Sequence, residues 1–276
     1  MVSVEICRTI PIMSAADSES HEIKVRYTGA CGNCGKSLPA GSSAKWDAIS
    51  KSLSCVGGCT EGAAGGSAQR EYDRRREKYE AAVKGENPIL APFILKFGNE
   101  PQRVKAWQQG ADGEVAVGHF LDQLTEFADV VVFHDRRIRG TKANIDHIVV
   151  SPAGVYVIDA KNYTGLVTID KSGGWLSPVV KTLRVGGRDC TKLVEGVKRQ
   201  VDKVATTLDP LNIPISTSGI LAFYLADWPW VGMPQEVDGV LVNGKGLRSL
   251  IATTGQLSSQ EVRIVADRIR KTFPQS

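Results

Sequence analysis

Apolar and polar positions along the chain predict both helices and strands. Apolar side chains recur at helical spacing in residues 114–128 and 191–208, which predicts two amphipathic helices. A third helix is expected at 258–273, where Ser258 provides an N-terminal cap. Short apolar runs predict buried strands at residues 130–134, 144–150, 155–160, 220–225 and 239–242. The order of helix, three strands, helix and two strands predicts an α/β sandwich rather than a strictly alternating doubly wound sheet.

The N-terminal half contains segments of different character. Residues 69–84 are dense in charge and contain neither Gly nor Pro, which predicts a helix supported by Glu71 and Arg75 at i and i+4. Residues 60–67 are rich in Gly and Ala and are typical of a flexible linker. Residues 87–110 contain three prolines and are expected to form an irregular connection.

The composition is that of a globular protein. The 276 residues are 42% hydrophobic, and 34 Lys and Arg against 30 Asp and Glu give a net charge of +4. So small an excess excludes binding to nucleic acid by overall charge alone. The N-terminus lacks the pattern of a secretory signal, and the longest apolar run, residues 220–226, is too short to span a bilayer. We therefore expect a soluble, cytoplasmic protein with no membrane partner.

Four of the six cysteines are concentrated near the N-terminus. They form two knuckles separated by twenty residues: Cys31, Cys34, Cys55 and Cys59. Four thiolates at this spacing suit one tetrahedral Zn²⁺ ion, and residues 45–53 can form a short hairpin between the knuckles, as in a zinc ribbon. Two disulfides or four unrelated buried thiols are the alternatives. Such a zinc site is closed to substrate, so its role would be structural. The isolated Cys7 and Cys190 are expected to be ordinary small apolar residues.

The most informative segment is a pair of neighbouring apolar strands that each carry an acid. Residues 151–154 fit a tight turn, and a hairpin in which Ser151 pairs with Gly154 places Asp146 directly opposite Asp159. Two carboxylates this close repel each other unless one is protonated or a divalent cation such as Mg²⁺ lies between them. Lys161 would lie on the same face, where its ammonium can position a metal-bound water and offset phosphate charge.

This pattern also has plainer interpretations. The tripeptide of an acid, any residue and a lysine is common. It occurs again at residues 22–24, where no second acid on a neighbouring apolar strand accompanies it. Asp146 and Asp159 can be ordinary strand-end acids in salt bridges with Lys161 or an arginine. His147 points to the opposite face of its strand and is expected to be a structural histidine.

Three motifs make this part of the chain resemble a known family. They are Gly113-Glu114, residues 144–147 (Asn-Ile-Asp-His) and residues 154–165 (Gly-Val-Tyr-Val-Ile-Asp-Ala-Lys-Asn-Tyr-Thr-Gly). In this order, they closely resemble the nuclease-related domain known as NERD, of the PD-(D/E)xK or restriction-endonuclease-like superfamily. The resemblance is close from about residue 113 to 165 and looser beyond it. It implies a three-layer α/β core with a mixed sheet, and a Mg²⁺- or Mn²⁺-dependent nuclease that binds DNA.

The resemblance also implies roles for individual residues. Asp146 matches the first acid of the superfamily, Asp159 the second acid and Lys161 the lysine. Glu114 matches an acid on the first helix that assists metal or water positioning, and Gln200 lies where the downstream helix often carries a glutamine. The proline that precedes the first acid in the superfamily is replaced by isoleucine, as in the NERD pattern.

Basic residues near these motifs are candidate phosphate contacts. Four precede the strand of Asp146 and two precede the helix of Gln200: Arg136, Arg137, Arg139, Lys142, Arg188 and Lys192. A solvated loop and local interactions at the helix start are the alternatives.

These inferences divide the chain into a zinc-ribbon-like module with its linker (1–67), a charged helix with an irregular connection (68–112) and a nuclease-like domain (113–276). The expected function is metal-dependent hydrolysis of DNA phosphodiester bonds. The alternative is a nucleic-acid or protein binding module that keeps the fold but does not cut. The zinc module can also serve a protein partner, and a homodimer is compatible with the sequence.

Overall fold

The computed structural model describes residues 20–32, 34–48, 51–127, 129–175, 177–229, 235–244, 247, 251 and 254–276. Cys7 therefore lies outside the described residues. The chain divides into two compact units, residues 1–56 and 57–276. In the described residues, no helix is long and apolar enough to cross a membrane.

The smaller unit is built from short antiparallel strands. One sheet has the order β1-β4-β5, and the remaining two strands pair with each other. The bounds are β1 Ser20–Lys24, β2 Gly29–Ala30, β3 Ser37–Leu38, β4 Ser43–Asp47 and β5 Ser52–Ser54. Trp46 pairs with Leu53 across β4 and β5, which confirms the predicted hairpin at residues 45–53.

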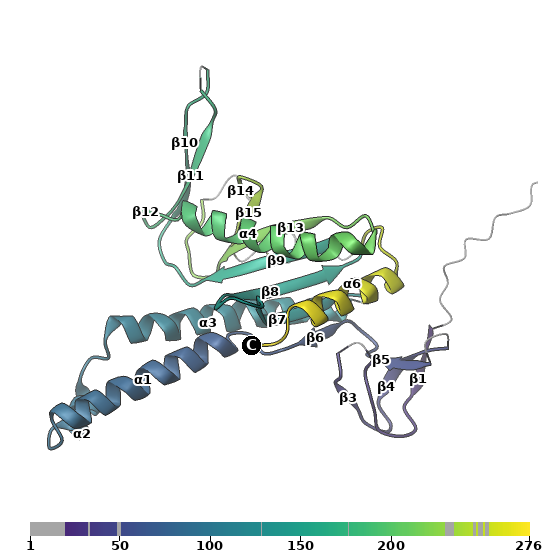
Figure 1. Cartoon of the computed structure of the whole chain (residues 1–276), viewed down its shortest axis with the longest axis horizontal. Coiled ribbons are helices and arrows are strands. Elements are labelled where there is room, and N and C mark those ends of the chain that lie inside the picture. Colours follow the sequence, from purple (N-terminus) through teal and green to yellow (C-terminus); the bar gives the residue numbers. More distant parts are fainter. Residues whose placement is uncertain are drawn as a thin grey trace, which may run out of the picture. The chain divides into compact units, whose positions relative to one another are not determined.

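The larger unit contains a seven-stranded mixed sheet of order β14-β15-β13-β9-β8-β7-β6 (Figure 1). The strands are β6 Cys59–Glu61, β7 Val131–Arg137, β8 Asn144–Ser151, β9 Gly154–Lys161, β13 Thr217–Phe223, β14 Gln235–Val237 and β15 Val240–Asn243. Neighbours β7, β8 and β9 are antiparallel, whereas β13 runs parallel to both β9 and β15. All five strands predicted for this sheet are present, and its short edge strands β6 and β14 were not predicted.

Helices cover both faces of this sheet. Their bounds are α1 Gly66–Glu86, α2 Ala91–Phe97, α3 Gln102–Asp122, α4 Thr191–Leu208 and α6 Ser259–Thr272, with 3-10 turns at Gln123–Glu126 and Asp209–Leu211. Val117 and Leu121 of α3 pack on one face, and α1 runs alongside α3 (Figure 1). Val197 of α4 packs with Phe223 on the other face, where α6 also lies. The mixed α/β class with layered helices is therefore confirmed.

Two segments differ from the sequence-based expectation. The predicted linker at residues 60–67 contains most of β6 and the start of α1. The predicted irregular connection at 87–110 contains α2 and the first half of α3. Its prolines do not break these helices, because Pro92 lies in the first turn of α2 and Pro101 caps α3, where no backbone N–H is needed.

The sequence also missed a long β-hairpin that follows β9. It consists of β10 Val167–Ser172 and β11 Val180–Val185, with the short β12 Arg188–Asp189 beside it. Among the described residues of this hairpin, the buried side chains lie at its base and include Val167 and Leu183. The hairpin extends away from the sheet at the end where β9 stops (Figure 1).

Candidate active site

The β8–β9 hairpin has the predicted register. Ser151 pairs with Gly154, and the ladder continues to His147 opposite Ile158. Beyond this pair, the backbone N–H of Ala160 bonds to a side chain. It donates a hydrogen bond to Oδ2 of Asp146 at 2.9 Å. The side chain of Asp146 is thereby held against the end of β9.

Lys161 connects the two strand acids. Its Nζ lies 2.6 Å from Oδ2 of Asp159 and 3.9 Å from Oδ2 of Asp146. It also donates a hydrogen bond to the carbonyl of Ala160 at 3.1 Å. All three charged side chains are mostly buried, with 13–24% of each exposed. The geometry therefore brings together three of the five residues that the sequence assigned to this site.

Glu114 reaches the site because α3 approaches the end of β9 very closely. A Cβ atom on Gly113 would lie 2.7 Å from Cβ of Asn162, so only glycine fits at this crossing. The Asn162 side chain donates a hydrogen bond to the carbonyl of Gln109 at 2.7 Å, which ties the helix to the strand end. Asp146 and Lys161 both act electrostatically on Glu114.

The cluster contains more carboxyl groups than the single ammonium of Lys161 can neutralise. Burial, followed by the charge of Asp159, raises the pKa of Asp146 to about 7. Burial, followed by the charge of Asp146, raises the pKa of Glu114 to about 9. Burial opposes the charge of Lys161, but Asp146 and Asp159 outweigh it and raise the pKa of its ammonium. Carboxylate oxygens are the donors that Mg²⁺ or Mn²⁺ prefers.

Residues 109–224 match the family model of NERD, the nuclease-related domain. The resemblance seen in the sequence is thereby confirmed, and the match supports a nuclease-related function. No curated protein and no solved structure matches the chain. The NERD segment contains Glu114, Asp146, Asp159, Lys161 and Gln200, and it leaves out the four clustered cysteines.

Asp135 belongs to the NERD segment and was missed by the sequence analysis. Its charge contributes to the raised pKa values of both Asp146 and Glu114. Asp135 is buried and has a φ of 51°, which turns its side chain out of the regular strand pattern. Its Oδ2 accepts a hydrogen bond from the N–H of Ser67 at 2.7 Å and so caps α1. The available signal in the sequence was an acid directly after the apolar run at residues 131–133 and His134.

The structural role predicted for His147 fits the geometry. Its Nδ1 lies 2.8 Å from Nδ1 of His134, whose Nε2 lies 2.9 Å from Oδ1 of Asp122. Both rings are almost fully buried, and burial followed by His134 lowers the pKa of His147 well below its usual value. His147 therefore stays neutral, on the sheet face opposite Asp146.

Gln200 of α4 contacts the strand of Asp146. Its Nε2 donates to the carbonyl of Asn144 at 3.4 Å, while its buried Oε1 has no hydrogen-bond partner in the described part of the chain. Gln200 thus lies beside the site with one unused acceptor.

The expectation that Arg136 lies in an exposed basic loop is wrong. Arg136 belongs to β7 and is only 4% exposed. Its Nη2 donates a hydrogen bond to Oε2 of Glu61 at 3.1 Å, and Arg270 also donates to the Glu61 carboxylate. The guanidinium carbon of Arg136 lies 4.7 Å from the ring centroid of Phe133. A buried cation needs such a partner, so Arg136 supports the edge of the sheet and cannot meet a phosphate.

The other predicted phosphate contacts are exposed, and their role stays a prediction. Arg137, Arg139 and Lys142 lie at the β7–β8 turn, and Arg139 donates to the carbonyl of Lys271 at 3.2 Å. Lys192 is exposed in the first turn of α4, and the guanidinium carbon of Arg188 lies 5.4 Å from the ring centroid of Tyr163.

Outside the NERD segment, four cysteine side chains form a compact group. The sulfurs of Cys31, Cys34, Cys55 and Cys59 all lie within 4.8 Å of one another. Sγ of Cys34 is 3.9 Å from Sγ of Cys55, far beyond the roughly 2 Å of a disulfide. Thiolates on one Zn²⁺ at about 2.3 Å from the metal would be separated by about this distance. The four cysteines can therefore hold a metal such as zinc. Cys190 packs in the core beside α4, as expected of a small apolar residue.

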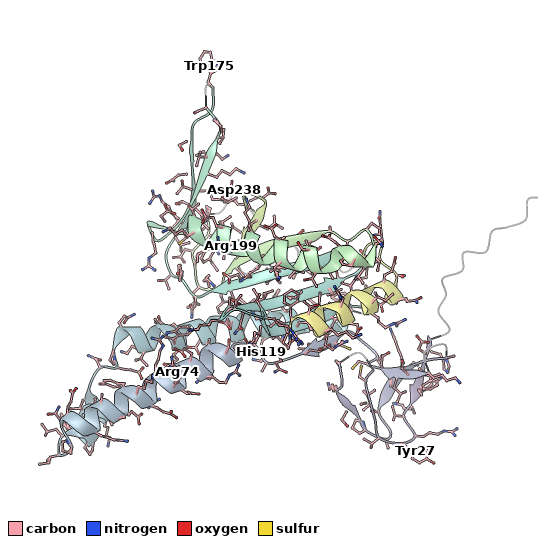
Figure 2. The ribbon with its side chains drawn as sticks, in the orientation of Figure 1. Tyr27, Arg74, His119, Trp175, Arg199 and Asp238 are labelled. Atoms are coloured by element: carbon pink, nitrogen blue, oxygen red, sulfur yellow. The ribbon has the colours of Figure 1, made fainter. Side chains whose placement is uncertain are left out.

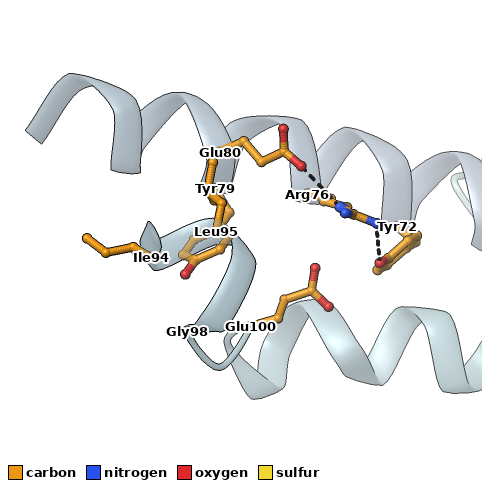
Figure 3. A pocket seen from close by; sticks show the side chains of 8 residues that line it. All are labelled: Tyr72, Arg76, Tyr79, Glu80, Ile94, Leu95, Gly98 and Glu100. Atoms are coloured by element: carbon orange, nitrogen blue, oxygen red, sulfur yellow. Dashed lines mark hydrogen bonds and ion pairs between the residues drawn. The ribbon is translucent and has the colours of Figure 1, made fainter. Parts of the chain in front are cut away.

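A separate hollow lies between α1, α2 and the start of α3 (Figure 3). It is lined by Tyr72, Arg76, Tyr79, Glu80, Ile94, Leu95, Gly98 and Glu100. Arg76 donates hydrogen bonds to the Tyr72 hydroxyl and to Glu80, so its cation is paired within its own helix. None of the predicted site residues lines this hollow.

Proposed function

We propose that the chain is a Mg²⁺- or Mn²⁺-dependent nuclease that hydrolyses phosphodiester bonds of DNA. The observation that carries the proposal is the Glu114–Asp146–Asp159–Lys161 cluster at the end of β9. Asp146 and Asp159 would hold the metal, which supplies Lewis acidity when bound. Glu114 would complete the oxygen ligands or hold a water.

The residues of this chain would perform distinct steps. Lys161 donates up to three hydrogen bonds, and it stands between both acids, so it can hold the attacking water in line with the phosphorus. Its ammonium also offsets the negative charge that builds up on the phosphate oxygens. The unused Oε1 of Gln200 provides an acceptor beside the same strand. We also propose that the four cysteines hold a structural zinc ion.

The test is cleavage of a supercoiled plasmid with added Mg²⁺ or Mn²⁺. Asp159→Asn and Lys161→Ala should each lower the rate at least about 100-fold, because the first removes a proposed metal ligand and the second removes the ammonium that would hold the attacking water. Asp112→Asn is the matched control, because Asp112 is exposed on α3 two residues before Glu114.

Wild-type protein that binds DNA without cutting it under any of these conditions would instead make the chain a binding module. Equal cleavage by the wild type and both site variants would place the chemistry elsewhere in the molecule.

A further inference from the structure

The β10–β11 hairpin carries a tryptophan that contributes nothing to the fold. Trp175 lies at the tip and is 100% exposed (Figure 2). Val179 and Val180 near the tip are also more than half exposed. Leaving an indole in water forfeits the burial energy that usually keeps aromatic side chains inside. These exposed apolar side chains at the tip are typical of a surface that binds another molecule.

Two described residues of the tip, Gly174 and Ser177, are nevertheless joined by a hydrogen bond. The N–H of Gly174 donates a hydrogen bond to the carbonyl of Ser177 at 3.0 Å. Gly173 has a φ of 83°, and a Cβ there would meet the carbonyl of Pro178 at 2.3 Å. The backbone just before Trp175 therefore requires glycine at position 173.

A pair of lysines lies a few residues behind this tryptophan. Lys171 and Lys181 are direct cross-strand partners, an arrangement in which like charges repel. Lys181 donates a hydrogen bond to the backbone carbonyl oxygen of Glu236, and a carbonyl does not neutralise the charge of the ammonium. Among the described residues, Lys171 forms no ion pair. The other cation of the hairpin strands, Arg184, is already paired with Asp170 at 2.7 Å. The lysine pair is therefore suited to an anion that touches both ammonium groups.

The hairpin is joined directly to the candidate active site. β10 begins six residues after Lys161, and the hairpin leaves the sheet at the end where β9 stops (Figure 1). Arg188, which stacks on Tyr163, lies at its base. Six residues in each strand give an arm of roughly 20 Å, at about 3.3 Å per residue.

We propose that this hairpin is an arm that holds single-stranded DNA, with a backbone phosphate between Lys171 and Lys181 and an unpaired base stacked on Trp175. This inference rests on the proposed nuclease function for its choice of DNA. Stacking on an indole tolerates any base sequence, and lysines read only phosphates, so the arm holds a strand without selecting its sequence.

The test is the fluorescence anisotropy of a labelled single-stranded oligonucleotide, measured without added Mg²⁺ or Mn²⁺. Trp175→Ala should weaken binding about 5- to 100-fold, and Trp175→Phe should recover most of the loss because a ring remains for stacking. Lys171→Ser with Lys181→Ser should lower the slope of log affinity against log salt by about 0.7 for each phosphate that the lysines no longer neutralise.

Matched controls come from α1 and α2. Phe93→Ala removes an aromatic side chain that is 65% exposed, and Lys78→Ser with Lys84→Ser removes two exposed lysines. These variants should bind the oligonucleotide as the wild type does.

Unchanged affinity and unchanged salt slope in the arm variants would overturn the proposal, as would a wild type that does not bind the oligonucleotide. A Trp175→Ala variant that alters only the oligomeric state would assign the tip to a second copy of the chain and also overturn it. Binding that depends on Trp175 would support the arm even if plasmid cleavage failed, so the arm and the nuclease chemistry are tested separately.

Discussion

Three carboxyl groups around one ammonium define the chemistry of the candidate site. Asp159 takes the closest contact with Lys161, and Asp146 accepts the N–H of Ala160. The pKa of Glu114 is raised further than that of Asp146. Side chains that cannot all ionise in the absence of a metal can do so when a divalent cation joins them, which couples metal binding to proton release.

The raised pKa of Asp146 predicts how stability changes with pH. The folded protein keeps this proton up to about pH 7, whereas the unfolded chain loses it near pH 4. The folded state therefore binds more protons in this window, and the contribution of Asp146 to the free energy of unfolding falls as pH rises through it. Asp146→Asn should stabilise the protein above pH 7 by about 1–4 kcal/mol, at about 1.4 kcal/mol per pKa unit.

Urea unfolding at several pH values, without added Mg²⁺, measures this effect. The difference between Asp146→Asn and wild type should vanish near pH 4 and grow towards pH 8. The exposed Asp112→Asn serves as the control. A difference that does not depend on pH would show that Asp146 ionises as an ordinary surface acid.

The approach of α3 to the end of β9 controls where Glu114 lies. Gly113→Ala would place a Cβ 2.7 Å from that of Asn162, so α3 must shift. We expect a loss of about 1–3 kcal/mol in stability, together with reduced cleavage. Gly110→Ala in the same helix meets no atom within 4 Å and should stabilise by about 0.5–1 kcal/mol through helix propensity.

Thermal unfolding and plasmid cleavage of the two alanine variants separate these effects. If Gly113→Ala were as stable and as active as Gly110→Ala, the close crossing would not be needed to position Glu114.

Elements with a strong local signal were predictable, and elements set by distant contacts were not. The turn at residues 151–154 fixed the register that brings Asp146 and Asp159 together. Asp135 was missed because its role depends on the start of α1, 68 residues away from it in the chain. Arg136 was misplaced because its partner Glu61 lies on an edge strand that the sequence did not reveal.

At the scale of the molecule, the described residues include candidate metal ligands of two opposite kinds. The NERD segment offers oxygen ligands, and the cysteine group offers sulfur ligands, which bind zinc tightly and magnesium poorly. The two proposed metals are therefore expected to respond to different treatments.

Zinc content provides the corresponding prediction. Purified protein should contain about one zinc per chain, and Cys31→Ser should lose most of it, since each of the four thiolates contributes a metal bond. Cys190→Ser is the control, because Cys190 lies in the core beside α4. A colorimetric zinc assay after denaturation measures the metal. Equal zinc in both variants, or none in the wild type, would contradict the assignment.

The buried histidine pair has a consequence for the placement of protons inside the sheet. A carboxylate can only accept, so Nε2 of a neutral His134 must carry the proton that is donated to Asp122. Nδ1 of His134 is then a bare lone pair, and the contact between the rings requires Nδ1 of His147 to be the donor. One tautomer of each ring is therefore selected. Both donors in this row point towards Asp122 at the end of α3, so the positive end of the resulting dipole faces the Asp122 carboxylate and the negative end is the lone pair on Nε2 of His147.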